Sequence, residues 1–542
     1  MEKGDFYTMK KILALVLAIM LCLSAIPAFA EAAGDELNLA MASNPETIDP
    51  TRNSAVDGAV YAIHQFEPLY RYSWDGNGVE PGMAESHEVS EDGLVWTFHL
   101  RDSKWSDGEP VKAQDFEFAF RRLVDPVLAA PYGGDMGAFI KNGLEVVEGT
   151  VPKEELGVKA IDDKTFEVTL SAPCPFFTEI IAFPVFSPIR EDIIEKYGDD
   201  NWIKTPESYV TNGAFMMEAF TLDEAMISVP NPGYWQADAI KPSKINWLFL
   251  VDDKAELAAL RAGEADFIDG FPQEESKALK ADGLHGIIPQ LGTYYVNFNN
   301  NAEPFTDAKV RKAFAMAIDT KFIAEVLREG SVVAGTALVG PGFKTSGFDG
   351  DFTKNYIDPE TYEANCEEAK KLLEEAGYPN GEGLPAIEYL LNDNTGHIMI
   401  GEALQKMWAD VLGANVEIRI ADWATVLVDR REGNFQVARD GWIGDYNDPA
   451  TMLTLFLSTS GNNSAQYNNP AFDAKIAESM AETDPAKRNA MLREAEDMMI
   501  GEDWACAPIY FYSDEYGVRP DLKDWAIMPL GYKFFHKAYI EK

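Results

Sequence analysis

The 542-residue sequence is poor in positive charge and in cysteine. It contains 46 Lys and Arg against 89 Asp and Glu, a formal net charge of −43 at pH 7. Such a surface repels nucleic acid and anionic lipid, and it is typical of a protein that stays soluble outside the cell; a field that attracts cationic ligands is the alternative interpretation. Beyond the N-terminal segment the cysteines are Cys174, Cys366 and Cys506. Three distant cysteines indicate buried thiols rather than a disulfide framework, with one bridge as the open alternative.

The chain also lacks the motifs of the common enzyme classes. There is no G-x-S-x-G, no H-E-x-x-H, no phosphate-binding loop and no paired C-x-x-C. The six histidines are scattered, and acid pairs are too frequent in so acidic a chain to indicate a glycosidase. We therefore expect no enzyme, no cofactor and no metal, and keep an exported hydrolase only as an alternative.

Long apolar runs are missing except at the N-terminus. The segment "MKKILALVLAIMLCLSAIPAFA" has two lysines, an apolar centre from Ile12 to about Ile26 and an A-x-A end. This pattern predicts a secretory signal peptide over residues 1–30, cleaved near Ala30. Cys22 follows a leucine instead of a small residue, so no lipid anchor is expected. No later run approaches the ~20 apolar residues of a membrane helix, and we expect an exported, soluble protein of the periplasm or cell envelope.

Strand and helix patterns alternate along the rest of the chain, which predicts a mixed α/β protein of roughly three structural units. Alternating apolar residues predict strands at 94–100 and 163–170. Helical spacing of apolar residues predicts helices at 112–124, 307–327, 362–376 and 485–500. For these helices, Thr306 or Asp307 is the expected cap of the second, Gly377 ends the third in the left-handed region, and Asp484 caps the fourth.

The most informative stretch is "RDGWIGDYNDPATML", residues 439–453. Asp448-Pro449 fits the cap and first position of a helix, which gives Asp448 a structural role. Asp445 lies outside that helix, between a glycine and a tyrosine, and has no local donor. A carboxylate among rings is costly to desolvate unless a cation meets it. Arg439, Arg430 or the ammonium of a ligand could supply the cation, and the residues alone favour the internal salt bridge.

The segment "RDGWIGDYNDP" resembles the R-x-G-W-x-x-D-Y-x-x-P signature of the oligopeptide-binding proteins of ABC importers, in the peptide/nickel-type family of solute-binding proteins. Further segments agree along nearly the whole mature chain: "LVWTFHLRDSKWSDGEPVKAQDFEFAFRRLVDP", "NPGYW" at 231–235, "PFTDAKVRKAFAMAID" and "AKKLLEEAGYPNGEG". The resemblance implies a two-lobed periplasmic-binding-protein fold with an extra third domain and a hinged ligand cleft. Lobe I would comprise residues 31–66, 195–293 and 507–542, the extra domain 67–194, and lobe II 294–506.

The resemblance also implies roles for individual residues. Asp445, in a cluster with Trp442 and Tyr446, matches the carboxylate that pairs with the α-ammonium of a peptide. The remaining expected ligand-binding residues fall into three groups: backbone flanking the peptide at Gly441, Ile443, Ser54 and Val56; cationic positions for ligand carboxylates at Arg439, Arg430 and His397; and cleft tyrosines Tyr132 and Tyr295. Ser54 and Asn297 stand where better-known members carry acids, a departure that bears on the preferred charge and length of the ligand.

The implied function is a receptor that captures short peptides in an extended conformation and delivers them to the permease subunits of an ABC transporter and their ATPases. The protein would be a monomer without nucleic-acid partners or membrane insertion. Two alternatives stay open. One is the same fold binding an oligosaccharide, a dipeptide or a metal chelate, and the other is a peptide-holding chaperone or an exported hydrolase.

Overall fold

The computed structural model describes residues 34–542 except 42–44, 46, 55, 77 and 251. The predicted signal peptide, residues 1–30, lies outside the described residues. Within the described part of the chain, no helix combines the length and apolarity that crossing a membrane requires.

One mixed sheet of eleven strands organises most of the molecule, which confirms the mixed α/β class. Its order is β15-β14-β16-β12-β17-β11-β1-β10-β9-β8, with β13 paired to β17. The bounds are β1 (Glu36–Ala40), β8 (Phe215–Thr221), β9 (Ala225–Pro230), β10 (Lys244–Leu248), β11 (Phe267–Ile268), β12 (His285–Phe298), β13 (Val333–Ala334), β14 (Ile387–Asn392), β15 (Val416–Ala421), β16 (Val437–Ile443) and β17 (Cys506–Val518).

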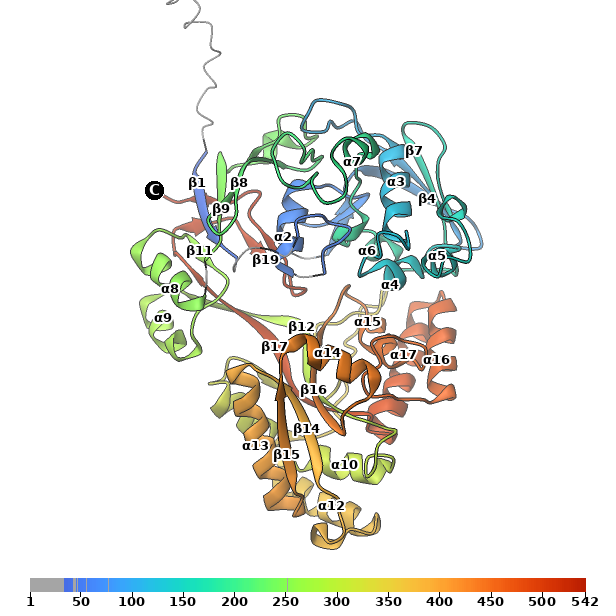
Figure 1. Cartoon of the computed structure of the whole chain (residues 1–542), viewed down its shortest axis with the longest axis vertical. Coiled ribbons are helices and arrows are strands. Elements are labelled where there is room, and N and C mark those ends of the chain that lie inside the picture. Colours follow the sequence, from blue (N-terminus) through green and yellow to red (C-terminus); the bar gives the residue numbers. More distant parts are fainter. Residues whose placement is uncertain (1–33, 42–44, 46, 55, 77, 251) are drawn as a thin grey trace, which may run out of the picture.

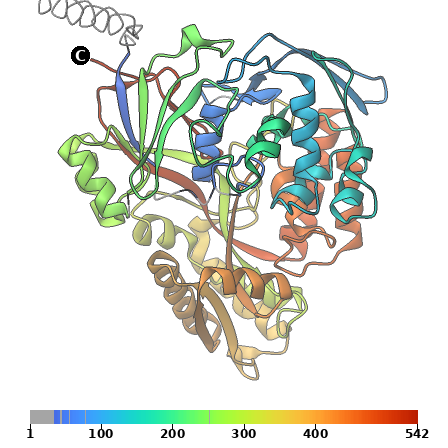
Figure 2. The same cartoon turned by 45° about the horizontal axis from the view of Figure 1, so that its top comes forward.

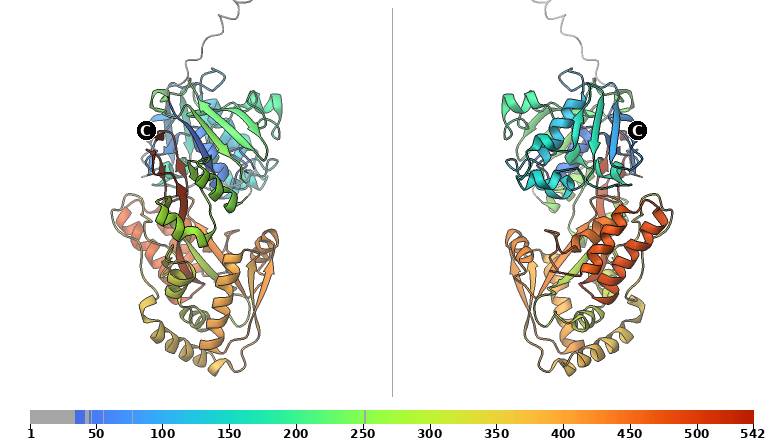
Figure 3. Two further views of the ribbon diagram at one scale, coloured as in Figure 1. Left: turned by 90° about the vertical axis from the view of Figure 1, so that its left-hand side faces the viewer. Right: turned by 90° about the vertical axis from the view of Figure 1, so that its right-hand side faces the viewer.

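The two longest strands, β12 and β17, join the two halves of this sheet. The chain passes from the upper half to the lower half along β12 and returns along β17 (Figures 1 and 3). Their antiparallel register breaks between Pro289 and Thr293, and again between Tyr294 and Tyr295. The pairing therefore consists of an upper and a lower segment with an irregular stretch between them. Because the ladder is interrupted there, we expect the two halves to bend relative to each other at this stretch.

A second sheet, of order β4-β5-β7-β6, lies in the upper half together with α3 (Figures 1 and 2). The bounds are β4 (Ala84–Val89), β5 (Val95–Leu100), β6 (Val158–Ala160), β7 (Thr165–Thr169) and α3 (Ala113–Leu123). Trp96, Phe98 and Leu100 of β5 are buried while their neighbours are only half-buried. The alternation predicted for this strand, and the helix after it, are thus confirmed.

The predicted helix over 307–327 is wrong as a single element. Asp307 caps α10 (Ala308–Met316) by accepting a hydrogen bond from the Lys309 amide at 2.8 Å, but α10 ends at Met316. Asp319 then caps a new segment through the amide of Phe322 at 2.9 Å: α11 (Thr320–Phe322), followed by a π-helical turn over Ile323–Leu327. A polar side chain that binds backbone N–H groups therefore ends one helix and starts another inside one apolar pattern.

The other two predicted helices are confirmed. In α12 (Tyr362–Glu375) the chain leaves the helix at Gly377, which has φ +95°, a conformation that glycine adopts without strain. Asp484 caps α17 (Pro485–Glu496) by accepting from the amides of Ala486 and Lys487. The three cysteines are buried free thiols, as the sequence indicated.

The remaining helices and short strands complete the two halves. The helices are α2 (Val56–Gln65), α4 (Gly133–Gly137), α5 (Gly143–Val147), α6 (Phe177–Ile180), α7 (Glu191–Tyr197), α8 (Asp253–Ala262), α9 (Ser276–Asp282), α13 (Thr395–Leu412), α14 (Trp423–Glu432), α15 (Ala450–Leu453) and α16 (Pro470–Ala481). Three two-stranded pairs are β2 (Tyr70–Tyr72) with β3 (Val79–Pro81), β18 (Leu522–Lys523) with β21 (Tyr539–Ile540), and β19 (Ala526–Ile527) with β20 (Lys533–Phe534).

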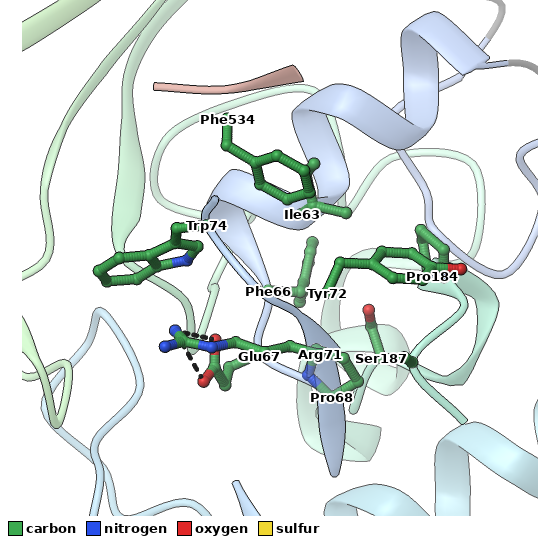
Figure 4. Close-up of a pocket in the computed structure, with 11 residues that line it drawn as sticks. Ile63, Phe66, Glu67, Pro68, Arg71, Tyr72, Trp74, Pro184, Ser187 and Phe534 are labelled. Atoms are coloured by element: carbon green, nitrogen blue, oxygen red, sulfur yellow. Dashed lines mark hydrogen bonds and ion pairs between the residues drawn. The ribbon is translucent and has the colours of Figure 1, made fainter. Parts of the chain in front are cut away.

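A buried ion pair joins β2 to the segment that follows α2 in the upper half. Arg71 lies between Glu67 and the ring of Trp74, with its guanidinium 4.2 Å from that ring centroid (Figure 4). The cavity beside this pair is about 10 Å³, room for about one water molecule at most. This cavity is therefore too small to receive an organic ligand.

Candidate functional site

The site is built on one open edge of β16. Strand β14 pairs with β16 only at Val437 and Ala438, whereas β12 pairs with all of β16. At the two ends, the Gly444 amide donates to Leu291 and the Asn299 amide donates to the carbonyl of residue 436. Because backbone groups alternate in direction along a strand, those of residues 439, 441 and 443 point away from β12. Along this stretch, no strand of the described chain covers them. Side chains meet two of these groups: the Gly441 amide donates to Asp440 Oδ1 at 2.8 Å, and the Arg439 carbonyl accepts from Arg430 at 3.3 Å.

Asp445 follows directly after this edge and is held between the two halves. The Tyr132 hydroxyl donates to Asp445 Oδ1 at 3.3 Å, and the Tyr72 hydroxyl donates to its carbonyl at 3.5 Å, both from the upper half. Thr451 accepts from the Asp445 amide at 3.0 Å and donates to Oδ2 at 3.5 Å. No Lys, Arg or His of the described chain forms an ion pair with Asp445, so the internal salt bridge favoured by the residues alone is wrong.

Burial, and to a smaller extent the nearby negative charge of Asp135, raise the pKa of Asp445 to about 7. Hydrogen bonding by Tyr132, Trp442 and Thr451 lowers the pKa and offsets part of this increase. The Trp442 indole N–H lies close enough to contribute but does not reach good hydrogen-bond geometry. The site thus holds a carboxylate that neutral donors surround and that lacks a cation, and an arriving ammonium would supply one.

A half-buried carboxylate without a cation should lower the stability of the empty protein. Because the folded-state pKa lies above the ordinary value of 3.8, this group favours folding at low pH, and that contribution is lost as pH rises from about 4 to 7. Asp445→Asn should therefore stabilise the empty protein at pH 8 by ~1–3 kcal/mol, less than the full shift implies because the side chain is partly solvated. Thermal unfolding at pH 8 and pH 5 checks this: Tm should rise at pH 8 and stay nearly unchanged at pH 5.

Arg439 lies at the other end of the open edge, six residues before Asp445. Its guanidinium is 5.1 Å from the ring centroid of Tyr294 and 5.8 Å from that of Trp423. No carboxylate of the described chain forms an ion pair with it, and its Nε has no hydrogen-bond partner. Neighbouring phenols, with Asp440, raise its pKa despite burial, so the side chain stays charged and can meet a ligand carboxylate.

The other two expected cationic positions differ from that expectation. Arg430 pairs with Asp440 at 2.6 Å, both side chains being nearly buried, so a ligand would have to share this arginine. Burial and the charges of Arg439 and Arg328 lower the pKa of His397 to about 3. His397 is therefore neutral at pH 7, because it is largely desolvated and lies beside two arginines, and it can act only as a hydrogen-bonding group.

The expected pieces from the upper half do meet Asp445. A cavity of about 80 Å³ is lined by residues of both halves: Asn53, Ser54, Val56, Ala59, Tyr132, Phe183, Ile443, Gly444, Asp445, Leu530 and Tyr532. Ser54 and Val56 are therefore close to Ile443, as expected. Val56, however, is the first residue of α2, so this segment approaches as a helix start and not as a strand.

Two of the expected rings have packing roles. Tyr446 is buried and stacks on Phe176 with centroids 5.3 Å apart, which joins the lower half to the segment around α6. Tyr295 is buried beside Phe456, on the opposite face of β12 from Tyr294. Asp448 has the structural role that the sequence predicted. It accepts a hydrogen bond from the Ala450 amide at 3.0 Å and also forms a buried bidentate ion pair with Arg488.

Sequence reasoning missed several residues of the site. Tyr72 and Tyr532 stack on each other above Asp445, and Tyr510, Tyr512 and Arg328 surround Arg439 and His397. Asp135, which faces Asp445, was missed as well. The only signal in the sequence was the "YFY" run at 510–512, whose alternation places two rings on one face of β17. Among the described residues, no group of three or more His, Cys, Asp or Glu could hold a metal ion.

Known proteins of the same architecture align with almost the whole chain. The chain is 34% identical over 514 residues to the oligopeptide-binding protein OppA of Bacillus subtilis, covering 93% of this chain and 92% of that protein. It is 37% identical over 489 residues to the periplasmic oligopeptide-binding protein OppA of Escherichia coli, covering 88% and 87%. The crystal structure of Haemophilus influenzae OppA in complex with RPPGFSPFR superposes with a TM-score of 0.79 at 32% identity, covering 94% and 99%.

The family described as bacterial extracellular solute-binding proteins, family 5 Middle, matches residues 78–464. This range includes the open edge of β16, Asp445 and Arg439. The match covers well over half of the sequence, and the chain therefore belongs to the bacterial extracellular solute-binding proteins of family 5.

Proposed function

We propose that this chain is an exported, non-catalytic receptor that captures short peptides in an extended conformation and delivers them to the permease of an ABC importer. The observation that carries the proposal is Asp445, a half-buried carboxylate without a cation at the end of a strand edge that no other described strand covers. The names of its relatives, which bind oligopeptides, support the same ligand class.

The peptide would add a strand to β16. The backbone groups of Arg439, Gly441 and Ile443 would pair with the peptide backbone, which gives affinity independent of side chains. The Gly441 amide and the Arg439 carbonyl would exchange their present bonds to Asp440 and Arg430 for bonds to the peptide. The α-ammonium would lie at Asp445 and the chain would run back toward Arg439. Six strand residues span about 20 Å, so peptides of about four to six residues would reach from one charge to the other.

The C-terminal carboxylate would meet Arg439, the one of these arginines without an acidic partner in the described chain. Arg430 would assist only by sharing its charge with Asp440. His397 would donate a hydrogen bond while neutral, and a bound carboxylate would raise its pKa from about 3. Free peptides carry both end charges, and proteins or blocked peptides lack them at accessible positions, so this arrangement selects by charge at the ends.

Closure around the ligand would couple binding to delivery. Tyr132 and Tyr72 of the upper half touch Asp445 of the lower half, and β12 and β17 are irregular where they cross between the halves. We place lobe I at 31–66, 195–293 and 507–542, the extra domain at 67–194 and lobe II at 294–506. A peptide that bridges the lobes would favour the closed state, whose surface a permease recognises; the receptor would act as a monomer.

N-terminal acetylation tests the ligand class. An acetylated peptide has no α-ammonium, so it should bind at least about tenfold more weakly than its free counterpart, about 1.4 kcal/mol or more. Isothermal titration of matched tetrapeptides measures the difference. Equal affinities of the two forms would remove the role of Asp445. Saturable binding of an oligosaccharide or a metal chelate, unaffected by Asp445→Asn, would identify the rival ligand class, and turnover of the peptide would identify a hydrolase.

A further inference from the structure

A second and larger cavity opens on the other side of Asp445. It has a volume of about 790 Å³ and shares Trp442 and Asp445 with the strand edge. Its other walls come from the segment around α4, through Asp135, Met136 and Phe139, and from the lower half around α15 and α16. Figures 1 and 2 both place these two regions next to each other. The volume lies within the range of small-molecule sites, ~300–1,000 Å³.

The walls of this cavity are apolar, and its ionisable groups other than phenol and thiol are all acids. Apolar side chains along it include Met136, Phe139, Leu144, Leu455, Leu457, Ile476 and Met480. The acids are Asp135, Asp445 and Asp473, and no Lys, Arg or His is among the lining residues. Asp473 is occupied, since it accepts hydrogen bonds from the amide and the hydroxyl of Ser458. None of the three acids forms an ion pair in the described chain, and Asp135 and Asp445 are the two whose charges interact across the cavity.

Asp135 belongs to α4, in the run Gly133-Gly134-Asp135, immediately after Tyr132, which donates to Asp445. It forms no ion pair in the described chain. Its side chain is exposed to the cavity, and partial desolvation raises its pKa. Its negative charge also raises the pKa of Asp445 across the cavity. Two like charges facing each other in a partly dry space repel, and a ligand with two positive charges would relieve both at once.

We propose that this cavity receives the side chain of the first peptide residue and that Asp135 selects lysine or arginine there. The α-ammonium would pair with Asp445, the methylene stem would lie along the apolar wall, and the terminal cation would reach Asp135. Lysine and arginine bury apolar stems while keeping the charged head beside a polar group, which suits this combination of walls. The inference rests on the proposed peptide-binding function and adds a preference at one position.

The test is a titration of four tetrapeptides, Lys-Ala-Ala-Ala, Arg-Ala-Ala-Ala, norleucine-Ala-Ala-Ala and Glu-Ala-Ala-Ala, against wild type, Asp135→Asn and Glu145→Gln. Glu145 is exposed on the neighbouring α5 and outside the cavity, so its substitution controls for lost charge. Wild type and Glu145→Gln should bind the lysine and arginine peptides about tenfold more tightly than the norleucine peptide, and the glutamate peptide more weakly still. Asp135→Asn should bring the lysine-to-norleucine ratio to within about twofold of one.

The ratio of affinities is the readout because Asp135→Asn also changes the field at Asp445 and shifts all peptides together. Binding of the norleucine peptide to Asp135→Asn shows that the variant is folded. An unchanged lysine-to-norleucine ratio in Asp135→Asn, or a ratio near one in wild type, would overturn the inference. Norleucine peptide binding that acetylation weakens would in either case leave the proposed function standing, whereas no binding of any of the four peptides to wild type would remove both.

Discussion

Asp445→Asn should weaken the binding of a free tetrapeptide by about 100-fold or more. Removing one partner of a buried charge pair leaves the other charge desolvated and unpaired, which costs about 2–5 kcal/mol. Here the unpaired charge would be the α-ammonium of the peptide. The neutral hydroxyls of Tyr132 and Thr451 remain in the variant, but they carry no negative charge to pair with it. Isothermal titration or tryptophan fluorescence with one unblocked tetrapeptide measures the loss.

The matched control is Glu402→Gln, which removes one negative charge from the exposed face of α13 in the same half. It should bind the peptide like wild type. Asp445→Asn should also bind free and acetylated peptides about equally, because the group that distinguishes them is gone. A variant that keeps its affinity within threefold of wild type would mean that the ammonium lies elsewhere.

Local signals in the sequence predicted where helices and strands lie better than they predicted whether a helix continues without a break. The alternation at 94–100 and the caps at Asp307 and Asp484 act through neighbouring residues, so they could be predicted from one stretch of chain. The break before Asp319 could not, because the apolar stripe continues through it while a side-chain cap competes for the backbone. The eleven-stranded sheet depends on pairings between distant segments, such as β1 with β11, which periodicity does not encode.

The site shows the same limit more sharply. The sequence predicted that Asp445 has no local donor and favoured an internal arginine as its partner, whereas in the structure Thr451 and Tyr132 donate to it and no arginine of the described chain pairs with it. In the structure Arg430 pairs with Asp440, which is buried on β16 and also accepts from Asn297. Two acids five residues apart compete for one arginine, and only the fold determines which one it reaches. Asp135 faces Asp445 from 310 positions away, beyond the reach of any spacing argument.

The raised pKa of Asp445 links peptide binding to proton release. The empty site has a pKa of about 7 because burial and Asp135 disfavour the charge, whereas a bound ammonium favours it and lowers the pKa. The other ionisable groups around the carboxylate are Tyr72, Tyr132, Tyr446 and Tyr532, whose pKa values are raised, so they stay neutral. Below pH 7 the peptide must therefore displace a proton from Asp445 before the ion pair forms.

Affinity for an unblocked peptide should consequently fall as pH decreases from 7 to 5, by about tenfold per unit and ~100-fold in total, if binding releases one proton. Above pH 8 affinity should fall again as the peptide's α-ammonium, with a pKa of about 7.7–8.0, loses its charge. Titration at pH 6 in two buffers of different ionisation enthalpy should report close to one proton released per peptide. The fall in affinity between pH 7 and 5 should disappear in Asp445→Asn and with acetylated peptides. In Asp135→Asn this fall should remain, with its midpoint moved to lower pH. An affinity independent of pH between 5 and 7 would mean that Asp445 is already ionised in the empty receptor, and that ammonium binding does not have to displace a proton.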